Sequence, residues 1–200
     1  MGLEALRLYD RAMKEGGMVY MGFGDAKKAF NAGQLGFYIN STAQIARSLK
    51  DIGDRFELLT GRHPLPAGRK DGRLVAGGNV GMILTDDPAR KAAAFEYIKL
   101  AASAWGSTVT VTETGYMPVN KLAAENPDFL KAFYEENPIY TTTLDQMDVI
   151  TGWYAFPGEN GLKAYKAIHD NVVTVLLGES TPEQALDQMV KDVNALLITE

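Results

Sequence analysis

Residues 56–84 read FELLTGRHPLPAGRKDGRLVAGGNVGMIL, and the rest of the chain is interpreted from this stretch. An apolar run breaks into a loop rich in proline and glycine, and a second apolar run is interrupted by Gly77 and Gly78. Proline fixes φ and removes a backbone donor, whereas glycine lacks a Cβ. The pattern predicts a strand, an exposed turn and a second strand with a glycine pair inside it. Such a pair marks either a place where the backbone comes close to a ligand or a β-bulge that contacts no ligand.

Four further stretches follow a recognisable order along the chain. They are FNAGQLGFYINSTAQIA (30–46), TGYMPV (114–119), FPGENGLKAYKAI (156–168) and LLGESTPEQALDQMVKDVNALL (176–197). With the Pro-Leu-Pro loop and the strand that ends in Gly-Gly, this order resembles the substrate-binding proteins of ABC importers. The resemblance is strongest to the family-1 extracellular solute-binding proteins, which include receptors for maltose, other sugars and glycerol-3-phosphate.

The resemblance implies an α/β fold of the periplasmic-binding-protein type II kind, in which two lobes close around a ligand. Family members are roughly twice as long as this chain, and every matched stretch belongs to their second half. We therefore expect the C-terminal portion of such a receptor, as a fragment, a truncated chain or the product of a split gene. By resemblance, residues 1–76 and 120–200 form the C-terminal lobe, and residues 77–119 cross the hinge as a helical segment of the N-terminal lobe.

Local patterns predict the secondary structure. Capping residues, apolar residues three to four apart and closing glycines indicate helices over residues 3–15, 25–33, 44–49, 87–104, 126–134, 162–177 and 180–197. Apolar runs indicate strands over residues 35–40, 56–59, 74–76 and 80–84.

The first group of candidate ligand residues comes from three separate stretches of the chain, and one of them is the end of the predicted strand at Asn40. In α/β sheets, ligands lie beyond the carboxyl ends of strands, where helix N-termini offer free N–H donors. Ser41 either contacts a ligand there, as the resemblance implies, or only caps the following helix. Tyr116 lies between a glycine and a proline, which suits a ring presented to a ligand, although a ring packed under a loop fits equally well. Gly77, Gly78 and Asn79 complete this group.

The second group lies in the loop from Tyr140 to Asn160, where aromatic residues are densest. Sugars present apolar faces and polar edges, so their sites combine aromatic platforms with amides and hydroxyls. Trp153, Tyr154 and Asn160 are the candidates here, whereas Phe156, before a proline, is expected in the core. The loop holds no Lys or Arg, although a phosphate group favours such donors. A neutral sugar or polyol is therefore the expected ligand.

Composition excludes several functions. The 200 residues are 46% hydrophobic with a net charge of −5, which fits a globular protein with a core and argues against nucleic-acid binding. Apolar runs fall short of the ~20 residues that a membrane span needs. The first residues lack the apolar centre of a signal peptide. The resemblance implies a periplasmic or extracellular location.

The amino-acid composition and motifs give little indication of a catalytic site. The chain has no Cys and two His, His63 and His169, which rules out a cysteine nucleophile and makes a His-rich zinc site unlikely. No glycine run completes a dinucleotide or P-loop motif. We expect no enzyme activity, metal or cofactor. By resemblance, the partners are a sugar or polyol and the permease subunits of an ABC transporter. The alternative is a stand-alone interaction domain that binds no sugar and self-associates where the absent lobe would dock.

Overall fold

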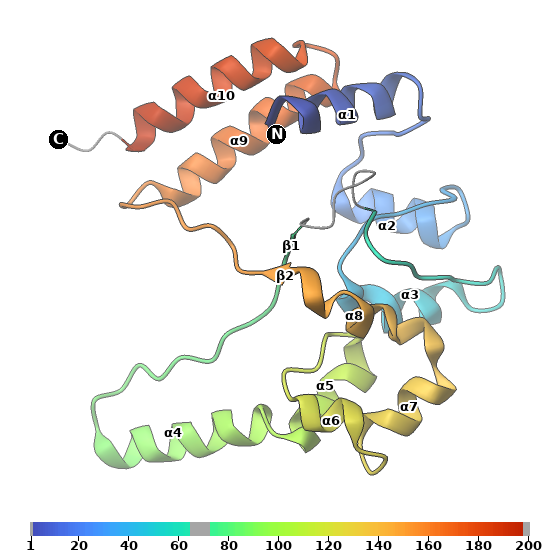
Figure 1. Ribbon diagram of the computed structural model, residues 1–200, viewed down its shortest axis with the longest axis vertical. Helices are drawn as coiled ribbons and strands as arrows, with labels where there is room; N and C mark the ends of the chain where they lie inside the picture. Colours follow the sequence, from blue (N-terminus) through green and yellow to red (C-terminus); the bar gives the residue numbers. More distant parts are fainter. Residues whose placement is uncertain (1, 65–72, 198–200) are drawn as a thin grey trace. The chain divides into compact units, whose positions relative to one another are not determined.

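The computed structural model describes residues 2–64 and 73–197, and it is mostly helical (Figure 1). The elements in chain order are α1 (Gly2–Lys14), α2 (Phe23–Asn31), η1 (Thr42–Gln44), α3 (Ile45–Ile52), β1 (Leu74–Val75), α4 (Pro88–Ala101), α5 (Ala104–Thr114), α6 (Lys121–Glu125), α7 (Leu130–Glu136), η2 (Pro138–Tyr140), α8 (Thr142–Asp145), η3 (Met147–Val149), β2 (Ile150–Thr151), α9 (Gly161–Leu176) and α10 (Pro182–Leu197). Pro66, Gly68 and Gly72 of the predicted turn lie outside the described residues.

The chain divides into two compact units. Unit 1 combines residues 1–25 with residues 153–200, and unit 2 comprises residues 26–152. Each unit is described here by itself.

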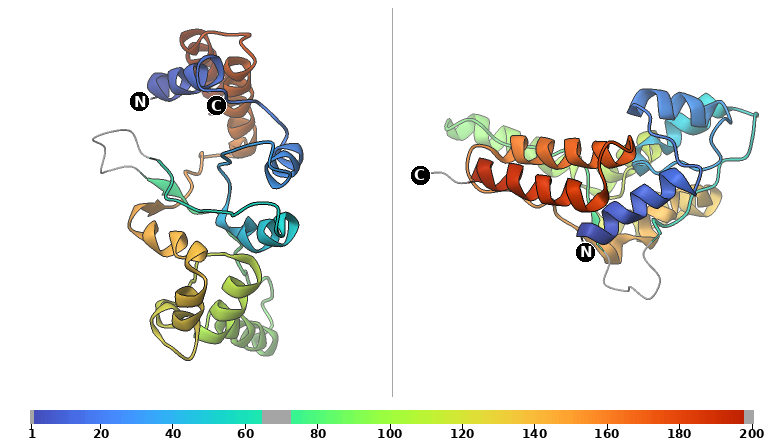
Figure 2. Two further views of the ribbon diagram at one scale, coloured as in Figure 1. Left: turned by 90° about the vertical axis from the view of Figure 1, so that its right-hand side faces the viewer. Right: turned by 90° about the horizontal axis from the view of Figure 1, so that it is seen from above.

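Unit 1 is built from α1, α9 and α10. α9 and α10 form an antiparallel hairpin, and α1 packs against both of them (Figures 1 and 2). The buried side chains that join the three helices are Leu6, Val175 and Ala185. At the surface, the Arg7 guanidinium bonds Glu183 at 2.7 Å, and this bond lowers the pKa of the Glu183 carboxyl.

The three helices of unit 1 confirm the predictions made for them. α10 starts with a capping box, because Thr181 Oγ1 accepts from the Gln184 N–H (3.2 Å) and Gln184 Oε1 accepts from the Thr181 N–H (3.0 Å). α1 ends before Gly16 and Gly17, as predicted. Asn160 holds the start of α9 to the end of α10, since its Nδ2 donates to the Leu196 carbonyl at 3.0 Å.

Unit 2 has a core of six buried side chains on short helices. They are Ile45, Val111, Ala123, Leu130, Tyr134 and Tyr140. Burial raises the pKa of both tyrosine hydroxyls above the ordinary value, so both stay protonated at neutral pH. Ile45 at the start of α3 and Tyr140 of η2 are core residues that lie beside Gly115 at the end of α5.

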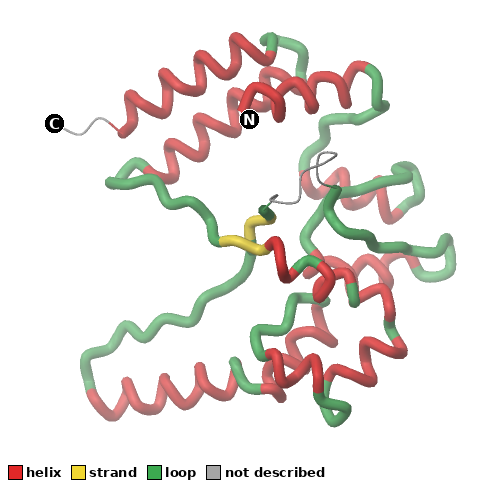
Figure 3. Tube along the Cα trace, in the orientation of Figure 1, coloured by secondary structure: helices red, strands yellow, loops and turns green. Residues whose placement is uncertain are grey.

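The predicted strands are mostly wrong. Among the described residues, the only strands are β1 and β2, a parallel pair with Leu74 opposite Ile150 and Val75 opposite Thr151 (Figure 3). Residues 35–40, 56–59 and 80–84 are coil. A strand needs a neighbour to accept and donate its backbone hydrogen bonds. The described residues are thus mostly helical with one short sheet, and the periplasmic-binding-protein type II fold stays a prediction.

Side chains anchor the first two of these coil segments instead. The Phe30 ring of α2 lies 5.5 Å from the Tyr38 ring and 6.0 Å from the Phe56 ring. Further along, Thr60 Oγ1 donates to the Ile139 carbonyl at 2.6 Å, and the His63 N–H donates to Gln146 Oε1 at 2.6 Å. These contacts fix the segments on helices without forming a ladder.

The helix predicted over residues 87–104 corresponds to α4, and the next helix, α5, lies almost entirely beyond the predicted range. The predicted start is confirmed, because Asp87 caps α4 by accepting from the Arg90 N–H (2.8 Å) with Pro88 in the first turn. α4 ends at Ala101, and Ser103 caps a new helix, α5. The buried side expected for α4 is wrong, since every residue of α4 is at least partly exposed. The coil before it exposes Val80, Met82 and Leu84.

Candidate functional site

The turn at Asn40 and Ser41 forms one wall of the candidate site in unit 2. Ser41 Oγ accepts from the Ala43 N–H at 3.3 Å and so caps η1, which is the structural role predicted for it. Asn40 Oδ1 accepts from the Ser41 N–H at 2.7 Å. Asn40 Nδ2 is buried. Burial raises the pKa of the Tyr38 hydroxyl, and a hydrogen bond with the Asn40 side chain partly offsets this rise.

The end of α5 lies against this turn. Gly115 caps α5 in the left-handed conformation, with φ 90°, and its α-carbon approaches the Thr42 carbonyl. Tyr116 follows directly, and its N–H donates to Thr114 Oγ1 at 3.1 Å. Two stretches that are far apart in sequence, 40–42 and 114–116, are thus neighbours in space.

Asn79 joins the same group. Its Nδ2 donates to the Tyr116 hydroxyl at 3.5 Å, a long hydrogen bond that brings the coil after β1 to the end of α5. Gly77 and Gly78 lie two and one residues before it in open space, because a Cβ built on either meets no atom within 4 Å. The structure therefore brings Thr42, next to Ser41, to Gly115, next to Tyr116, and it brings Asn79 to the Tyr116 hydroxyl. It shows no close backbone contact at the glycine pair among the described residues.

The second predicted group lies in unit 1, where four rings form an aromatic cluster. The Phe156 ring packs edge-on against Tyr154 (5.0 Å between centroids) and Tyr165 of α9 (5.2 Å). Trp153 lies 6.4 Å from the same Tyr165 ring and is 62% exposed. Phe156 is half-buried beneath exposed rings, in keeping with its predicted packing role. Trp153 and Tyr154 offer their surfaces to solvent.

The other half of the predicted aromatic loop has a different role. Residues 138–151 fold into η2, α8, η3 and β2, and Thr142, Thr143 and Gln146 are buried there. Thr143 Oγ1 donates to the Tyr140 carbonyl and Gln146 accepts from His63, so these groups are used within the fold. Asn160 likewise joins α9 and α10, with Lys163 Nζ donating to its Oδ1 at 3.0 Å.

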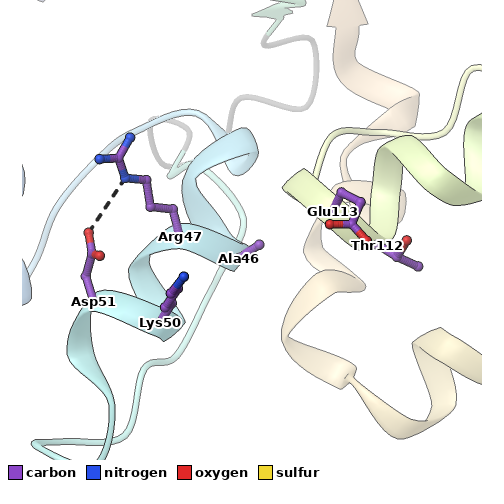
Figure 4. Close-up of a pocket in the computed structure, with 6 residues that line it drawn as sticks. All are labelled: Ala46, Arg47, Lys50, Asp51, Thr112 and Glu113. Atoms are coloured by element: carbon purple, nitrogen blue, oxygen red, sulfur yellow. Dashed lines mark ion pairs between the residues drawn. The ribbon is translucent and has the colours of Figure 1, made fainter.

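A groove opens between α3 and α5, beside the contact at Gly115 (Figure 4). Its volume is about 590 Å³, and it is lined by Ala46, Arg47, Lys50, Asp51, Thr112 and Glu113. The charges on its walls are of both signs, and Arg47 lies 3.9 Å from Asp51 on the same helix (Figure 4). Such exposed pairs are weak. The predicted site residues, all of which are described, do not line this groove.

A polar network that the sequence analysis missed supports the turn at Ser41. Lys27 of α2 is largely buried and donates to Gln44 Oε1 of η1 at 3.0 Å. Asp51 accepts from Asn31 Nδ2 at 3.2 Å and lies 4.0 Å from Lys27 Nζ. The network ties α2 to η1 and α3. Its members are ordinary polar residues of amphipathic helices, and no local pattern distinguishes them.

The structure offers little for catalysis. Within residues 2–64 and 73–197, no group of three or more His, Asp or Glu side chains could hold a metal ion. His63 and His169 are exposed, as predicted. No helix in the described ranges combines the length and apolar character needed to cross a bilayer.

Comparison with protein families identifies the class of protein. Residues 2–142 match the model of a family described as bacterial extracellular solute-binding protein. The match covers more than half of the chain and includes Asn40, Ser41, Asn79 and Tyr116. No curated protein matches the sequence.

This chain belongs to the bacterial extracellular solute-binding protein family. Membership implies ligand binding for transport, a small-molecule ligand with transporter partners, and an extracellular or periplasmic location. Proteins of this family are typically not enzymes.

Proposed function

We propose that this chain is the substrate-binding component of an ABC importer and that it binds a neutral sugar or polyol for delivery to the membrane permease. In this proposal, residues 1–76 and 120–200 belong to one lobe of the receptor, and residues 77–119 cross its hinge. A ligand held between lobes favours their closed arrangement by its greater affinity for that state.

The contact between residues 40–42 and residues 114–116 is the observation that carries the proposal. It is a backbone approach of Thr42 to Gly115, and it supports a site made of the Asn40 amide, the Ser41 hydroxyl and the Tyr116 ring, with Asn79 bonded to Tyr116. These side chains are uncharged. A group of neutral donors and acceptors beside a ring suits a sugar or polyol better than a phosphate, which favours Arg or Lys.

The exposed rings of the aromatic cluster supply the second argument. Trp153 and Tyr154 are 62% and 67% exposed, and Phe156 and Tyr165 support them from below. A large aromatic side chain held in place by other rings loses little conformational freedom on binding the apolar face of a sugar. Gly77, Gly78 and Asn160 are further residues proposed to lie near the ligand.

Isothermal titration calorimetry tests this proposal with a matched pair of ligands. We expect heat from at least one of maltose, glucose and glycerol, and weaker or no heat from glycerol-3-phosphate, which has the polyol skeleton with a charged group added. Heat from glycerol-3-phosphate alone would reverse the proposed preference. No heat from any of the four would remove the support for sugar binding.

The substitution Trp153→Ala should weaken binding of the neutral ligand by about tenfold or more, because a buried aromatic anchor is typically worth about 2 kcal/mol at an interface. Trp105→Ala is the matched control, since Trp105 is similarly exposed (59%) but belongs to α5 of unit 2 and not to the aromatic cluster. Calorimetry on both variants checks the prediction. Equal affinity in the Trp153 variant would exclude this ring from the site.

Self-association is a second candidate function, favoured by the exposed coil before α4. Val80, Met82 and Leu84 alternate along this coil and are all more than two-thirds exposed. α4 adds exposed Phe95 and Tyr97. Apolar residues on alternate positions of an unpaired extended segment favour pairing with another strand.

Sedimentation velocity distinguishes this second candidate. If the exposed coil mediates association, Leu84→Lys should shift a dimer or larger species to monomer at micromolar concentration. Leu162→Lys is the matched control, because Leu162 is similarly exposed (86% against 91%) but lies alone on α9. Self-association would be ruled out if the unsubstituted chain sediments as a monomer. Association through the exposed coil would also be ruled out if both variants move equally from dimer to monomer.

A further inference from the structure

The spacing between the Ser41 turn and Tyr116 depends on one residue, Gly115. Its N–H donates to the Val111 carbonyl at 2.8 Å and closes α5, and its φ of 90° lies in the left-handed region. Glycine adopts this region without steric cost, whereas other residues do so rarely. The backbone therefore turns at Gly115 from the helix into Tyr116.

The surroundings of Gly115 leave no room for a side chain. A Cβ at this position would lie 2.6 Å from the Thr42 carbonyl oxygen, 3.2 Å from Ile45 Cβ and 3.3 Å from a Tyr140 ring carbon. The closest of these atoms belongs to the backbone, so no rotamer change relieves the overlap. Either η1 or the end of α5 has to move.

We propose that Gly115 is a positioning residue for the ligand site. Its bare backbone lets residues 40–42 and Tyr116 approach each other, and this approach sets the distance between the donors at Asn40 and Ser41 and the Tyr116 ring. The Tyr116 hydroxyl in turn accepts from Asn79, so a shift at Gly115 that moves Tyr116 also reaches Asn79. The inference rests on the proposed function, because the spacing matters only if these residues hold a ligand.

The substitution Gly115→Ala tests this role, with Gly53→Ala as the matched control. Gly53 also caps a helix, α3, with positive φ (56°), but a Cβ there meets no atom within 4 Å. Both substitutions strain the backbone, but only Gly115→Ala also forces residues 40–42 away from the end of α5. We expect Gly115→Ala to weaken binding of maltose, glucose or glycerol at least tenfold by calorimetry, and Gly53→Ala to change affinity less than twofold.

A second variant separates misfolding from mispositioning. Gly115→Asn keeps the Cβ overlap but tolerates positive φ better than alanine does, so it should fold more stably and still bind weakly. In ¹H–¹⁵N spectra, the Asn79 side-chain amide signal of each variant is compared with that of the unsubstituted chain, both without ligand and both with ligand. The signal should differ in both Gly115 variants and should not differ in Gly53→Ala.

The outcomes separate the two claims. If the unsubstituted chain binds and Gly115→Asn binds equally well, the positioning role is overturned while the proposed function stands. An unmoved Asn79 amide in a folded Gly115 variant also overturns it. If the unsubstituted chain gives no heat with maltose, glucose or glycerol, the proposed function fails, and the positioning role for those ligands fails with it.

Discussion

Leu130→Ala should lower the free energy of unfolding of unit 2 by about 2–5 kcal/mol, which is the usual cost of truncating a fully buried leucine. Leu130 is 0% exposed and lies in the core shared by α3, α5, α6 and α7. The cavity left behind would separate side chains that hold these short helices together. Because a short helix is only marginally stable alone, loss of this packing should destabilise all the helices that share the core of unit 2.

Urea titration measures this change, with Trp105 as the reporter of unit 2. Each unit contains one of the two tryptophans, so a Trp153→Phe background leaves fluorescence from unit 2 alone. Leu122→Ala is the control, since Leu122 lies on the neighbouring helix α6 and is 68% exposed. A change of less than about 0.5 kcal/mol is expected there. Similar losses in both variants would contradict a core centred on Leu130.

Leu6→Ala should destabilise unit 1 by a comparable amount, about 2–5 kcal/mol. Leu6 is 4% exposed and is the buried residue through which α1 packs on α9 and α10. Without this contact, α1 keeps the exposed Arg7–Glu183 pair, and such pairs contribute little. We therefore expect α1 to detach while the hairpin of α9 and α10 persists.

The matched control for this second prediction lies on the same helix. Leu8 is 53% exposed, so Leu8→Ala removes the same atoms from a site that faces water. In a Trp105→Phe background, Trp153 reports on unit 1, because it lies against Tyr165 of α9. Loss of helical circular dichroism in Leu6→Ala but not in Leu8→Ala would support the assignment, and equal loss would refute it.

The sequence predicted helices far better than strands, and the reason is physical. The signals for α1, α9 and α10 are local, since caps, apolar spacing and closing glycines act within a few residues of one another. Thr181 and Gln184, for example, make the reciprocal bonds that their spacing indicates. A strand instead depends on a partner that its own residues do not specify. Residues 80–84 have the apolar alternation of a strand and remain coil.

The candidate site was predictable only in part. Ser41 was expected either to cap a helix or to contact a ligand, and the structure shows the cap. That Asn40, Ser41, Asn79 and Tyr116 share one ligand site is a prediction from resemblance rather than from any pattern in the residues. The backbone approach of Thr42 to Gly115 and the bond from Asn79 to Tyr116 support it, and both are properties of packing.

The make-up of unit 1 has a consequence for how the protein is synthesised. α1 emerges from the ribosome long before α9 and α10, which are the helices that bury Leu6. Until then, α1 has no partner from its own unit, whereas residues 26–152 can already assemble. Nascent chains stalled at increasing lengths should therefore acquire protease resistance in unit 2 first, and α1 should become protected only after α9 and α10 have been synthesised.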